Sequence, residues 1–586
     1  MGWNDRAREV PETAVEIVLR VGSAFFLSEI GLALLILGLA LAAPRVGRGF
    51  FERVERWGTA MGSTPGRQIL AVGLLAIAAR AVLLPWFGPP APAIHDEQSL
   101  LLQAQTYLAG RMTNPTHPFW EHFETFHVNQ IPAYASMYFP GRSAPLTAGL
   151  LLFDNAWAGV WLSFVLMCMA AVWMLQGWVP APYALLGGLF LVIRFGLFSY
   201  WVNSYWGGAF TAMGAMLVLG ALPRILRRPG WRLGATFGIG AAILMTARPY
   251  EGLLLCLPVT VVLAARFLRP SWSGGRWVLL RMALPATMMV GAGGLLLLSN
   301  NVATTGSASM TPYTLNRMTY AEAPAFVIAQ PVQSARRGPA YFREFYTAEG
   351  QNYMERRGSL RGFVKATAGK LFHTWNFYVG PVFTMALLAG LWVARRNLFL
   401  LGTLVFFLAG YALVTWNFPH YTAPILPVLL IVLMFGFQRL RTWTWRGRPT
   451  GLFLTRAMPT AAVAVLLLPL SSLLTGVPRM QTNQILQACC SAPLDDLRTE
   501  LVARLAAVPG RDLVLVRDGP GNPLHYEMVY NAPDIDAADV VFARRLGPER
   551  DQALLEHMAG RNVWEFEWRP GLPDDSTLIL LSPVKR

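Results

Sequence analysis

Apolar runs long enough to cross a lipid bilayer are the feature that most constrains this chain. A helix needs about 20 consecutive apolar residues to cross a hydrocarbon core about 30 Å thick. Because 54% of the 586 residues are hydrophobic and only 14% are charged, the sequence excludes an ordinary cytosolic enzyme and predicts an α-helical integral membrane protein. About twelve transmembrane helices are expected, at 24–43, 69–86, 156–175, 183–200, 207–223, 233–247, 252–267, 278–299, 374–394, 398–415, 421–437 and 457–474.

Arginines are concentrated in short connections that share one side of the membrane when the predicted spans alternate. These connections lie at 45–67, 224–232, 266–276, 395–396 and 439–448. Because cytoplasmic loops retain Lys and Arg, we assign this side to the cytoplasm of a bacterial-type inner (plasma) membrane. The net charge of +16 then reflects topology, and no nucleic-acid partner is expected. Function is expected on the opposite, extracytoplasmic face.

Three regions follow from this topology. Residues 1–68 hold an added N-terminal helix and a cytoplasmic connection, 69–476 form the main transmembrane module, and 477–586 form a soluble extracytoplasmic domain. In the last region the strand patterns DLVLV (512–516) and DVVFA (539–543) alternate with helical stretches, which predicts a small, mostly parallel α/β sheet. We expect this domain to modulate or recognise without doing chemistry. Cys489 and Cys490 could form a vicinal disulfide or remain thiols.

Two extracytoplasmic loops, 88–143 and 300–370, interrupt the transmembrane module. In the first, Asp96 and Glu97 stand at the start of a helical pattern that ends at Gly110. Asp96 could be an N-cap, which accepts hydrogen bonds from the first-turn amides, or a carboxylate that takes a proton from a nucleophile at the membrane surface. The two roles are compatible, because a capping carboxylate is also an oriented one.

The acidic pair after a transmembrane helix resembles the Asp-Glu motif of the GT-C superfamily, which includes protein O-mannosyltransferases and the lipid A aminoarabinose transferase. The stretch YFPGRSAPL (138–146) is similar to the Tyr-Pro-Pro-Gly-like stretch of bacterial members. His420-Tyr421, followed by Pro424 and Pro427, resembles the aromatic and proline residues at the start of a late helix in this superfamily. The resemblance covers residues 69–440 and implies a GT-C-like transmembrane module. One departure is that the acidic pair follows the second span, where relatives carry it after the first.

This resemblance implies an inverting-type glycosyltransferase that uses a polyprenyl-phosphate-linked sugar and works among membrane lipids. Asp96 would be the base, and Glu97 would orient it or the acceptor. Cationic side chains are then needed to bind the donor phosphate. For each candidate, the alternative role is to anchor the chain at the membrane interface or to pair with a nearby carboxylate. These candidates are Arg142, Arg248, His420 and Lys370. Acceptor or sugar binding is assigned to His95, His127, Tyr138, Asn203, Tyr205 and Trp206, although the aromatics of 199–208 also fit an interfacial belt.

The segment HPFWEHFETFH (117–127) raises a metal question. His117, His122 and Glu124 could bind a divalent metal, but their spacing matches no strong zinc template. An amphipathic segment lying on the membrane is therefore preferred, and no cofactor is firmly predicted.

The competing function is a transporter or flippase of lipid-linked glycans, because Glu29 and Arg194 lie within apolar spans. Transporters place polar sites at mid-membrane on repeated helices, whereas here no internal repeat is visible and the polar residues gather in outer loops. The enzyme is therefore favoured, and a non-catalytic assembly scaffold is a third reading. The sugar, and whether the acceptor is a glycan, a lipid or a protein, are left open.

Overall fold

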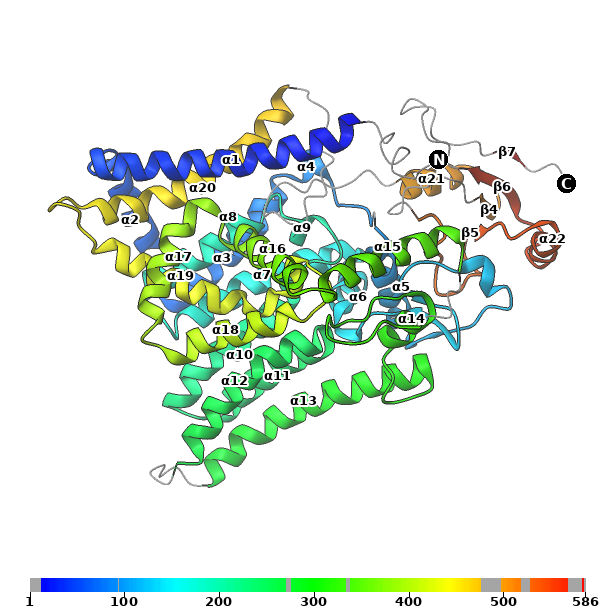
Figure 1. The fold of residues 1–586 in the computed structure, drawn as a ribbon, viewed down its shortest axis with the longest axis horizontal. Helices are drawn as coiled ribbons and strands as arrows, with labels where there is room; N and C mark the ends of the chain where they lie inside the picture. Colours follow the sequence, from blue (N-terminus) through cyan, green and yellow to red (C-terminus); the bar gives the residue numbers. More distant parts are fainter. Residues whose placement is uncertain are drawn as a thin grey trace.

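The computed structural model describes residues 12–92, 94–269, 276–333, 338–475, 497–517, 527–567 and 582–583. Cys489 and Cys490 lie outside the described residues, as does the boundary expected at 476/477. Helices form a body at one end of the molecule, and the two loops and the C-terminal region lie at the other (Figure 1).

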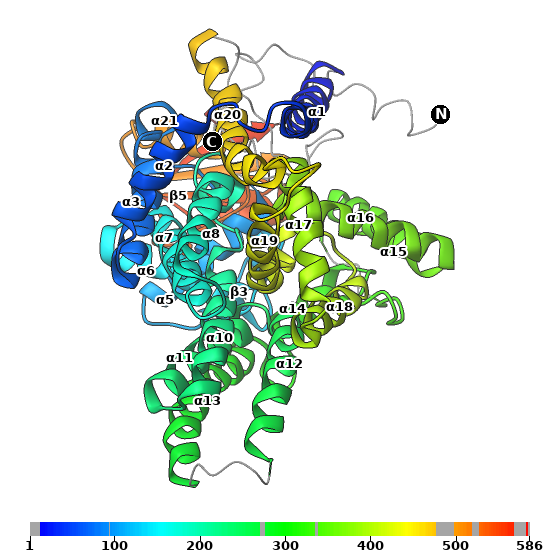
Figure 2. The ribbon, with the colours of Figure 1, turned by 90° about the vertical axis from the view of Figure 1, so that its left-hand side faces the viewer.

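The helical body is built from the predicted apolar runs together with short connecting helices, and several of its helices are seen nearly end-on in Figure 2. Its first half comprises α1 (Glu12–Ala42), α2 (Arg48–Met61), α3 (Pro65–Ala81), α4 (Leu84–Phe87), α6 (Ala144–Phe153), α7 (Ala156–Leu175), α8 (Ala181–Phe195), α9 (Tyr200–Asn203), α10 (Ala209–Arg227), α11 (Trp231–Ala247), α12 (Pro249–Phe267) and α13 (Arg276–Thr305). Its second half comprises α16 (Leu360–Tyr378), α17 (Gly380–Ala394), α18 (Leu398–Ala412), η4 (Pro419–Tyr421), η5 (Ala423–Ile425), α19 (Leu426–Arg441) and α20 (Thr450–Thr475).

Each predicted span coincides with helical structure, but twelve full-length spans are not confirmed. Among the described residues, 6 helices are long and apolar enough to cross a membrane, or up to 7 if one bent pair counts as a span. The remaining predicted spans fall on shorter apolar helices, including α8, α11 and α18.

The predicted span 374–394 is broken. The chain bends by 102° between α16 and α17, where Gly380 adopts a φ of 70° that favours glycine. Apolar composition continues through the bend, which is why the sequence pattern did not reveal it.

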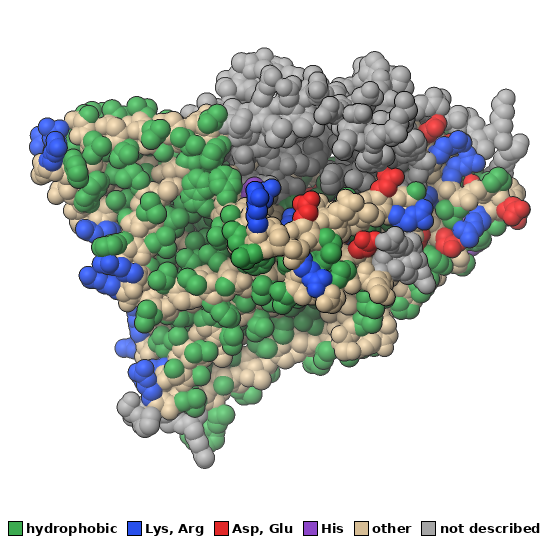
Figure 3. Space-filling view, viewed as in Figure 1, with side chains coloured by type: hydrophobic (Ala, Val, Ile, Leu, Met, Phe, Trp, Pro, Cys, Tyr) green, Lys and Arg blue, Asp and Glu red, His purple; other side chains and the backbone are tan. Residues whose placement is uncertain are grey.

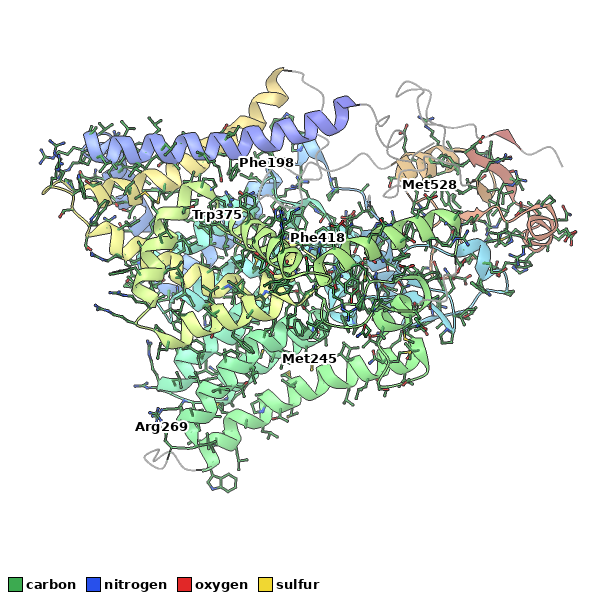
Figure 4. All side chains as sticks on the ribbon, viewed as in Figure 1. Phe198, Met245, Arg269, Trp375, Phe418 and Met528 are labelled. Atoms are coloured by element: carbon green, nitrogen blue, oxygen red, sulfur yellow. The ribbon has the colours of Figure 1, made fainter. Side chains whose placement is uncertain are left out.

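The two ends of the molecule differ in charge. Lys and Arg side chains gather along the edge of the helical body, whereas acidic and basic side chains are mixed over the loops and the C-terminal region (Figure 3). Arg269, from one of the connections assigned to the cytoplasm, lies at the basic end, and Met528 lies far from it at the other (Figure 4).

Loop 88–143 folds into α5 (His95–Leu108), η2 (Trp120–Phe123), η3 (Pro140–Arg142) and a three-stranded sheet of β1 (Asn114–Pro115), β2 (Val128–Asn129) and β3 (Ala133–Ser136). The sheet order is β1-β3-β2, and both pairings are antiparallel. Phe123 and Phe126 are each 1% exposed and pack against protein. The expectation of an amphipathic segment lying on the membrane is therefore wrong for these two rings. Loop 300–370 contributes α14 (Pro312–Tyr320) and α15 (Ala340–Arg357), together with the start of α16.

The C-terminal region forms the small α/β sheet that the sequence predicts. Its elements are α21 (Leu497–Leu505), β4 (Asp512–Arg517), β5 (Val540–Arg544), α22 (Pro548–His557), β6 (Asn562–Glu567) and β7 (Ser582–Pro583). The strand order is β5-β4-β6-β7, with β4 parallel to both neighbours and β7 antiparallel to β6.

Candidate active site

Asp96 lies in the first turn of α5, at the boundary between the helical body and loop 88–143. It is not the N-cap, because α5 starts after Ile94 and the Ile94 N–H donates to the Glu97 carboxylate at 3.2 Å. The other Glu97 oxygen accepts the Tyr205 N–H at 2.8 Å. Glu97 therefore supplies the capping interaction and joins α5 to the segment before α10, which leaves the Asp96 side chain available for other contacts.

Three side chains from loop 88–143 surround the Asp96 carboxylate. His95 Nδ1 lies 3.0 Å and His127 Nε2 3.8 Å from Asp96 Oδ2, and the Tyr138 hydroxyl donates a hydrogen bond to Oδ1. Burial raises the pKa of Asp96, but attraction to the His127 and His95 rings when they carry a proton, together with the hydrogen bonds from His95 and Tyr138, outweighs it, so this pKa lies well below its ordinary value. At neutral pH, where the His127 ring is uncharged, the hydrogen bonds from His95 and Tyr138 favour the carboxylate. Asp96 is therefore a carboxylate at neutral pH.

The His127 ring beside this carboxylate is buried and neutral. Burial lowers the pKa of His127 to about 3, although attraction to Asp96 partly opposes the shift. Its backbone φ is 60°, an uncommon left-handed conformation for a residue with a side chain. The His127 carbonyl accepts hydrogen bonds from the Met137 N–H at 3.0 Å and the Ser99 hydroxyl at 2.7 Å.

The cluster of His95, Asp96 and His127 could also hold a divalent metal, because their candidate ligand atoms all lie within 4.8 Å of one another. The set considered from the sequence does not gather in this way. His117 Nε2 lies 3.1 Å from Asp536, His122 Nδ1 lies 2.8 Å from the Arg544 carbonyl, and Glu124 accepts the Tyr320 hydroxyl at 3.0 Å.

His117, Asp536 and His557 form a second compact group. His117 Nδ1 accepts the Phe119 N–H at 3.0 Å, so the proton of the neutral ring resides on Nε2 and donates to Asp536. A metal ion needs an unprotonated nitrogen facing it, and this tautomer does not offer one at Nε2. The group is a hydrogen-bonded contact between the loop and the C-terminal domain.

Arg142, Arg248 and His420 come together around one partly open cavity, next to Trp201, Tyr205 and Trp206. The Arg142 guanidinium lies 4.2 Å from the centre of the Tyr138 ring, and the Arg248 guanidinium lies 3.9 Å from that of Tyr421. Burial, followed by repulsion from Arg248, lowers the pKa of Arg142. A bound anion would relieve this repulsion.

Donors at this cavity are left for a ligand. Arg248 Nη2 and Trp201 Nε1 are buried without a hydrogen-bond partner among the described residues. Burial, and then repulsion from the two arginines, lowers the pKa of His420 well below its ordinary value, so the ring is neutral. The Tyr200 hydroxyl oxygen accepts a hydrogen bond from the backbone N–H of His420. It also lies 3.1 Å from the ring Nδ1 of His420, to which the hydroxyl can donate its hydrogen. The ring proton then resides on Nε2 as a further donor.

Two residues predicted at the site have contacts elsewhere in the chain. The Lys370 ammonium donates to the carbonyls of Tyr411, Ala412 and Val414 at the end of α18 and is not among the residues that line the cavity. Asn203 donates to the carbonyls of Leu197 and Ser199, 3.0 and 3.1 Å away, and holds its own turn.

Trp206 and Tyr205 do line the cavity, and the Tyr205 hydroxyl also donates to the Pro90 carbonyl at 2.9 Å. The Trp206 ring lies 4.9 Å from that of His420, which also stacks on Phe418 at 5.6 Å (Figure 4 labels Phe418 near the centre of the molecule).

Several contributors were missed in the sequence. Tyr200 and Trp201 are 1% and 0% exposed, although aromatics of this turn also fitted an interfacial belt. Loop 300–370 covers the Asp96 cluster, because Phe345 lies 6.0 Å from His95 and Phe342 stacks on Phe126 at 4.0 Å, measured between ring centroids. The sequence signals for this loop are its length and its helical stretches rich in Arg and Tyr, which suggest a lid or an acceptor-binding role without assigning that role to particular residues.

No protein-family model matches the chain, and neither does any curated protein sequence. Among solved structures, the archaeal oligosaccharyltransferase AglB from Archaeoglobus fulgidus, in complex with an inhibitory peptide and a dolichol-phosphate, is 10% identical over 77% of this chain, with a TM-score of 0.40. The match spans 62% of the length of that protein. ArnT from Cupriavidus metallidurans in the apo state is 13% identical over 84% of this chain and 92% of its own, with a TM-score of 0.44. Both likenesses are low, with TM-scores below 0.5, and the function proposed below rests on the geometry of the site.

Proposed function

We propose that this protein is a membrane glycosyltransferase that moves a sugar from a polyprenyl-phosphate donor to an acceptor hydroxyl with inversion. One observation carries the proposal: the Tyr138 ring joins a half-buried carboxylate to a cationic cavity. Its hydroxyl hydrogen-bonds Asp96, and its face contacts Arg142, which lines the cavity. A proton acceptor and an anion site thus lie one side chain apart.

In the proposed reaction, Asp96 accepts the proton of the acceptor hydroxyl as its oxygen bonds to the anomeric carbon. The bond from that carbon to the phosphate oxygen breaks on the opposite face, and the phosphate leaves with the bonding electrons. Arg142 and Arg248 balance the charge that develops on the phosphate, and the His420 Nε2–H donates to it. Because the pKa of Asp96 is low, the proton transfers late, once bond formation has acidified the hydroxyl.

Trp201, Trp206 and Tyr205 supply the wall of the cavity where the sugar would lie. Aromatic faces suit the apolar faces of sugar rings, and the Trp201 Nε1–H is left to donate to a hydroxyl. The donor lipid would extend into the surrounding bilayer. We place the site on the extracytoplasmic face of a bacterial-type inner membrane, because the arginine-rich end lies opposite it.

A transporter is less well supported, because its intramembrane charges have local partners. Arg194 pairs with Glu29 and also donates to the Phe377 carbonyl at 3.1 Å and to the Asn376 carbonyl. This arrangement accounts for both residues as a buried structural contact.

Sugar transfer by membranes that contain wild-type protein or Asp96→Asn tests the proposal. With radiolabelled polyprenyl-phosphate sugars and matched protein abundance, the variant should lose at least about 100-fold of the rate, the size of effect expected for a general base. Asp154→Asn is the matched control, because Asp154 is an exposed helix C-cap with a φ of 50°, which asparagine tolerates. Equal transfer by Asp96→Asn and wild type would contradict Asp96 as the base.

The same assay separates phosphate binding and metal use from the base. Arg248→Lys should raise the donor KM by about tenfold, because lysine lacks the planar fork that binds two oxygens. Loss of transfer in EDTA, with recovery in Mn²⁺ or Mg²⁺, would assign the His95, Asp96 and His127 cluster to a metal and not to a free base. Absence of transfer from any donor would exclude these donors as substrates.

A further inference from the structure

Loop 88–143 and the C-terminal domain share one hydrophobic core. Leu102 of α5, Phe123 of η2, Val128 of β2 and Tyr134 of β3 pack in the same buried cluster as residues of β4, β5 and α22. The C-terminal members of this cluster are Leu513, Leu515, Tyr530, Ile535, Val541, Ala543, Leu554 and Met558. The domain is therefore packed into the loop that carries Asp96 and His127.

Arg544, at the end of β5, is the central polar contact of this junction. Its side chain is 1% exposed and pairs with Glu527 at 3.0 Å. Its Nη2 also donates to the Glu124 carbonyl at 3.0 Å, and its own carbonyl lies 2.8 Å from His122 Nδ1. One buried arginine thus connects to the loop on both sides of Phe123.

Two tyrosines add hydrogen bonds across the junction. The Tyr530 hydroxyl of the domain donates to the Phe126 carbonyl at 3.2 Å, and the Tyr134 hydroxyl of the loop donates to the Asn531 carbonyl at 2.9 Å. The Phe126 carbonyl belongs to the peptide group that leads directly into His127.

These contacts flank the left-handed backbone of His127. A non-glycine residue rarely adopts this conformation, which persists where its surroundings hold it. Before His127, Arg544 and Tyr530 hold the carbonyls of Glu124 and Phe126. After it, Ser99 and Met137 hold its own carbonyl.

We infer that the C-terminal α/β domain positions the proposed active site, with Arg544 and Tyr530 acting as positioning residues for His127 and, through it, for Asp96. This inference rests on the proposed function for its catalytic consequence, but the contacts themselves can be tested without it. Loss of either side chain should free the 122–130 segment while leaving the cavity formed by Arg142, Arg248 and His420 in place.

Hydrogen exchange of the full-length protein in detergent, read by mass spectrometry, gives the structural readout. In Arg544→Lys and in Tyr530→Phe, amide exchange in 122–130 should speed up at least tenfold. The matched control is Arg545→Lys, because the neighbouring Arg545 bonds Asp551 and Glu565 within the domain at 3.2 and 2.8 Å. Tyr530→Phe removes a single hydroxyl and keeps the test valid if Arg544→Lys does not fold.

Kinetics give the second readout. In the transfer assay, kcat should fall at least tenfold in Tyr530→Phe with the donor KM unchanged, because the phosphate-binding residues lie outside the 122–130 segment. Unchanged exchange in both variants, or faster exchange with unchanged kcat, would overturn the inference. Faster exchange in a protein whose wild type transfers no sugar would keep the structural coupling and reject the proposed function.

Discussion

At the scale of single residues, burial sets the charges that the site can use. Asp96 stays ionised because the contacts around it favour the carboxylate, whereas burial keeps His127 and His420 neutral. The site therefore presents one anion at the proposed acceptor side and two guanidinium groups at the proposed donor side. That polarity suits a reaction in which the acceptor loses a proton and the leaving group gains negative charge.

His127 should make the folded protein sensitive to mild acid. Its pKa is about 3 in the folded chain and about 6.5 in the unfolded chain, so between these values only the unfolded chain takes up this proton. The neutral ring therefore imposes no pH-dependent cost above pH 6.5. Below this pH the free energy of unfolding declines, by up to about 1.4 kcal/mol per pH unit. The pKa of Asp96 is also lowered in the folded chain, so protonation of the unfolded chain at this residue acts in the same direction and does not oppose the trend.

Thermal unfolding at pH 7.5, 6.5 and 5.0 checks this prediction. The apparent Tm of the wild type should fall by about 2 °C between pH 6.5 and 5.0, and His127→Gln should fall by clearly less, whatever its Tm at pH 7.5. Parallel pH profiles for the two proteins would show that His127 is not the group that takes up the proton.

The sequence predicted a candidate set of site residues but not the contacts that each one makes. Arg142, Arg248 and His420, predicted from positions near the outer ends of apolar runs, lie together around one cavity, and Tyr138 connects Asp96 to it. Glu97 was predicted to orient the base or the acceptor, and Lys370 to bind phosphate; in the structure they bind backbone groups of residues 94, 205, 411, 412 and 414. Sequence does not show which backbone groups will face a charged side chain, because this depends on helix packing between distant segments.

At the scale of elements, periodicity located the helices but not their interruptions. Each apolar run became helical, yet α8, α11 and α18 are shorter than a full span. The break between α16 and α17 is held by Arg194, which bonds the carbonyls of Asn376 and Phe377 and pairs with Glu29 of α1. Such a contact joins residues about 180 positions apart and leaves no local pattern.

Gly380 should be essential to this bend. A Cβ at Gly380 would lie 2.5 Å from both Arg194 Nη2 and Glu29 Oε2, and the φ of 70° disfavours any L side chain. Gly380→Ala should therefore lower the free energy of unfolding by at least about 1–2 kcal/mol, more if the buried ion pair separates. Gly402→Ala in α18 is the matched control, because a Cβ there meets nothing within 4 Å.

Thermal unfolding in detergent of both glycine variants provides the measurement. We expect a lower Tm for Gly380→Ala, with Gly402→Ala unchanged or slightly stabilised because alanine favours helices. Equal Tm values for the two variants would mean that the bend does not depend on this close packing.

At the scale of the whole molecule, the charge asymmetry and the position of the site together predict which side of the membrane the site faces. The arginine-rich edge and the loop end lie at opposite ends of the helical body (Figures 3 and 4). If the basic end faces the cytoplasm, the Asp96 cluster and the C-terminal domain must face the other compartment, where the acceptor would be met.

Single cysteines test this orientation in intact cells. Cysteines replace Arg228, in a connection assigned to the cytoplasm, and Glu556, an exposed residue of α22, in a chain whose four native cysteines are replaced by serine or alanine. A membrane-impermeant maleimide should label Cys at 556 in spheroplasts and Cys at 228 only after the membrane is permeabilised. Labelling of both sites after permeabilisation controls for accessibility. The opposite pattern would place the site in the cytoplasm. The arginine-rich connections would then face the other compartment, contrary to the rule that cytoplasmic loops retain Lys and Arg.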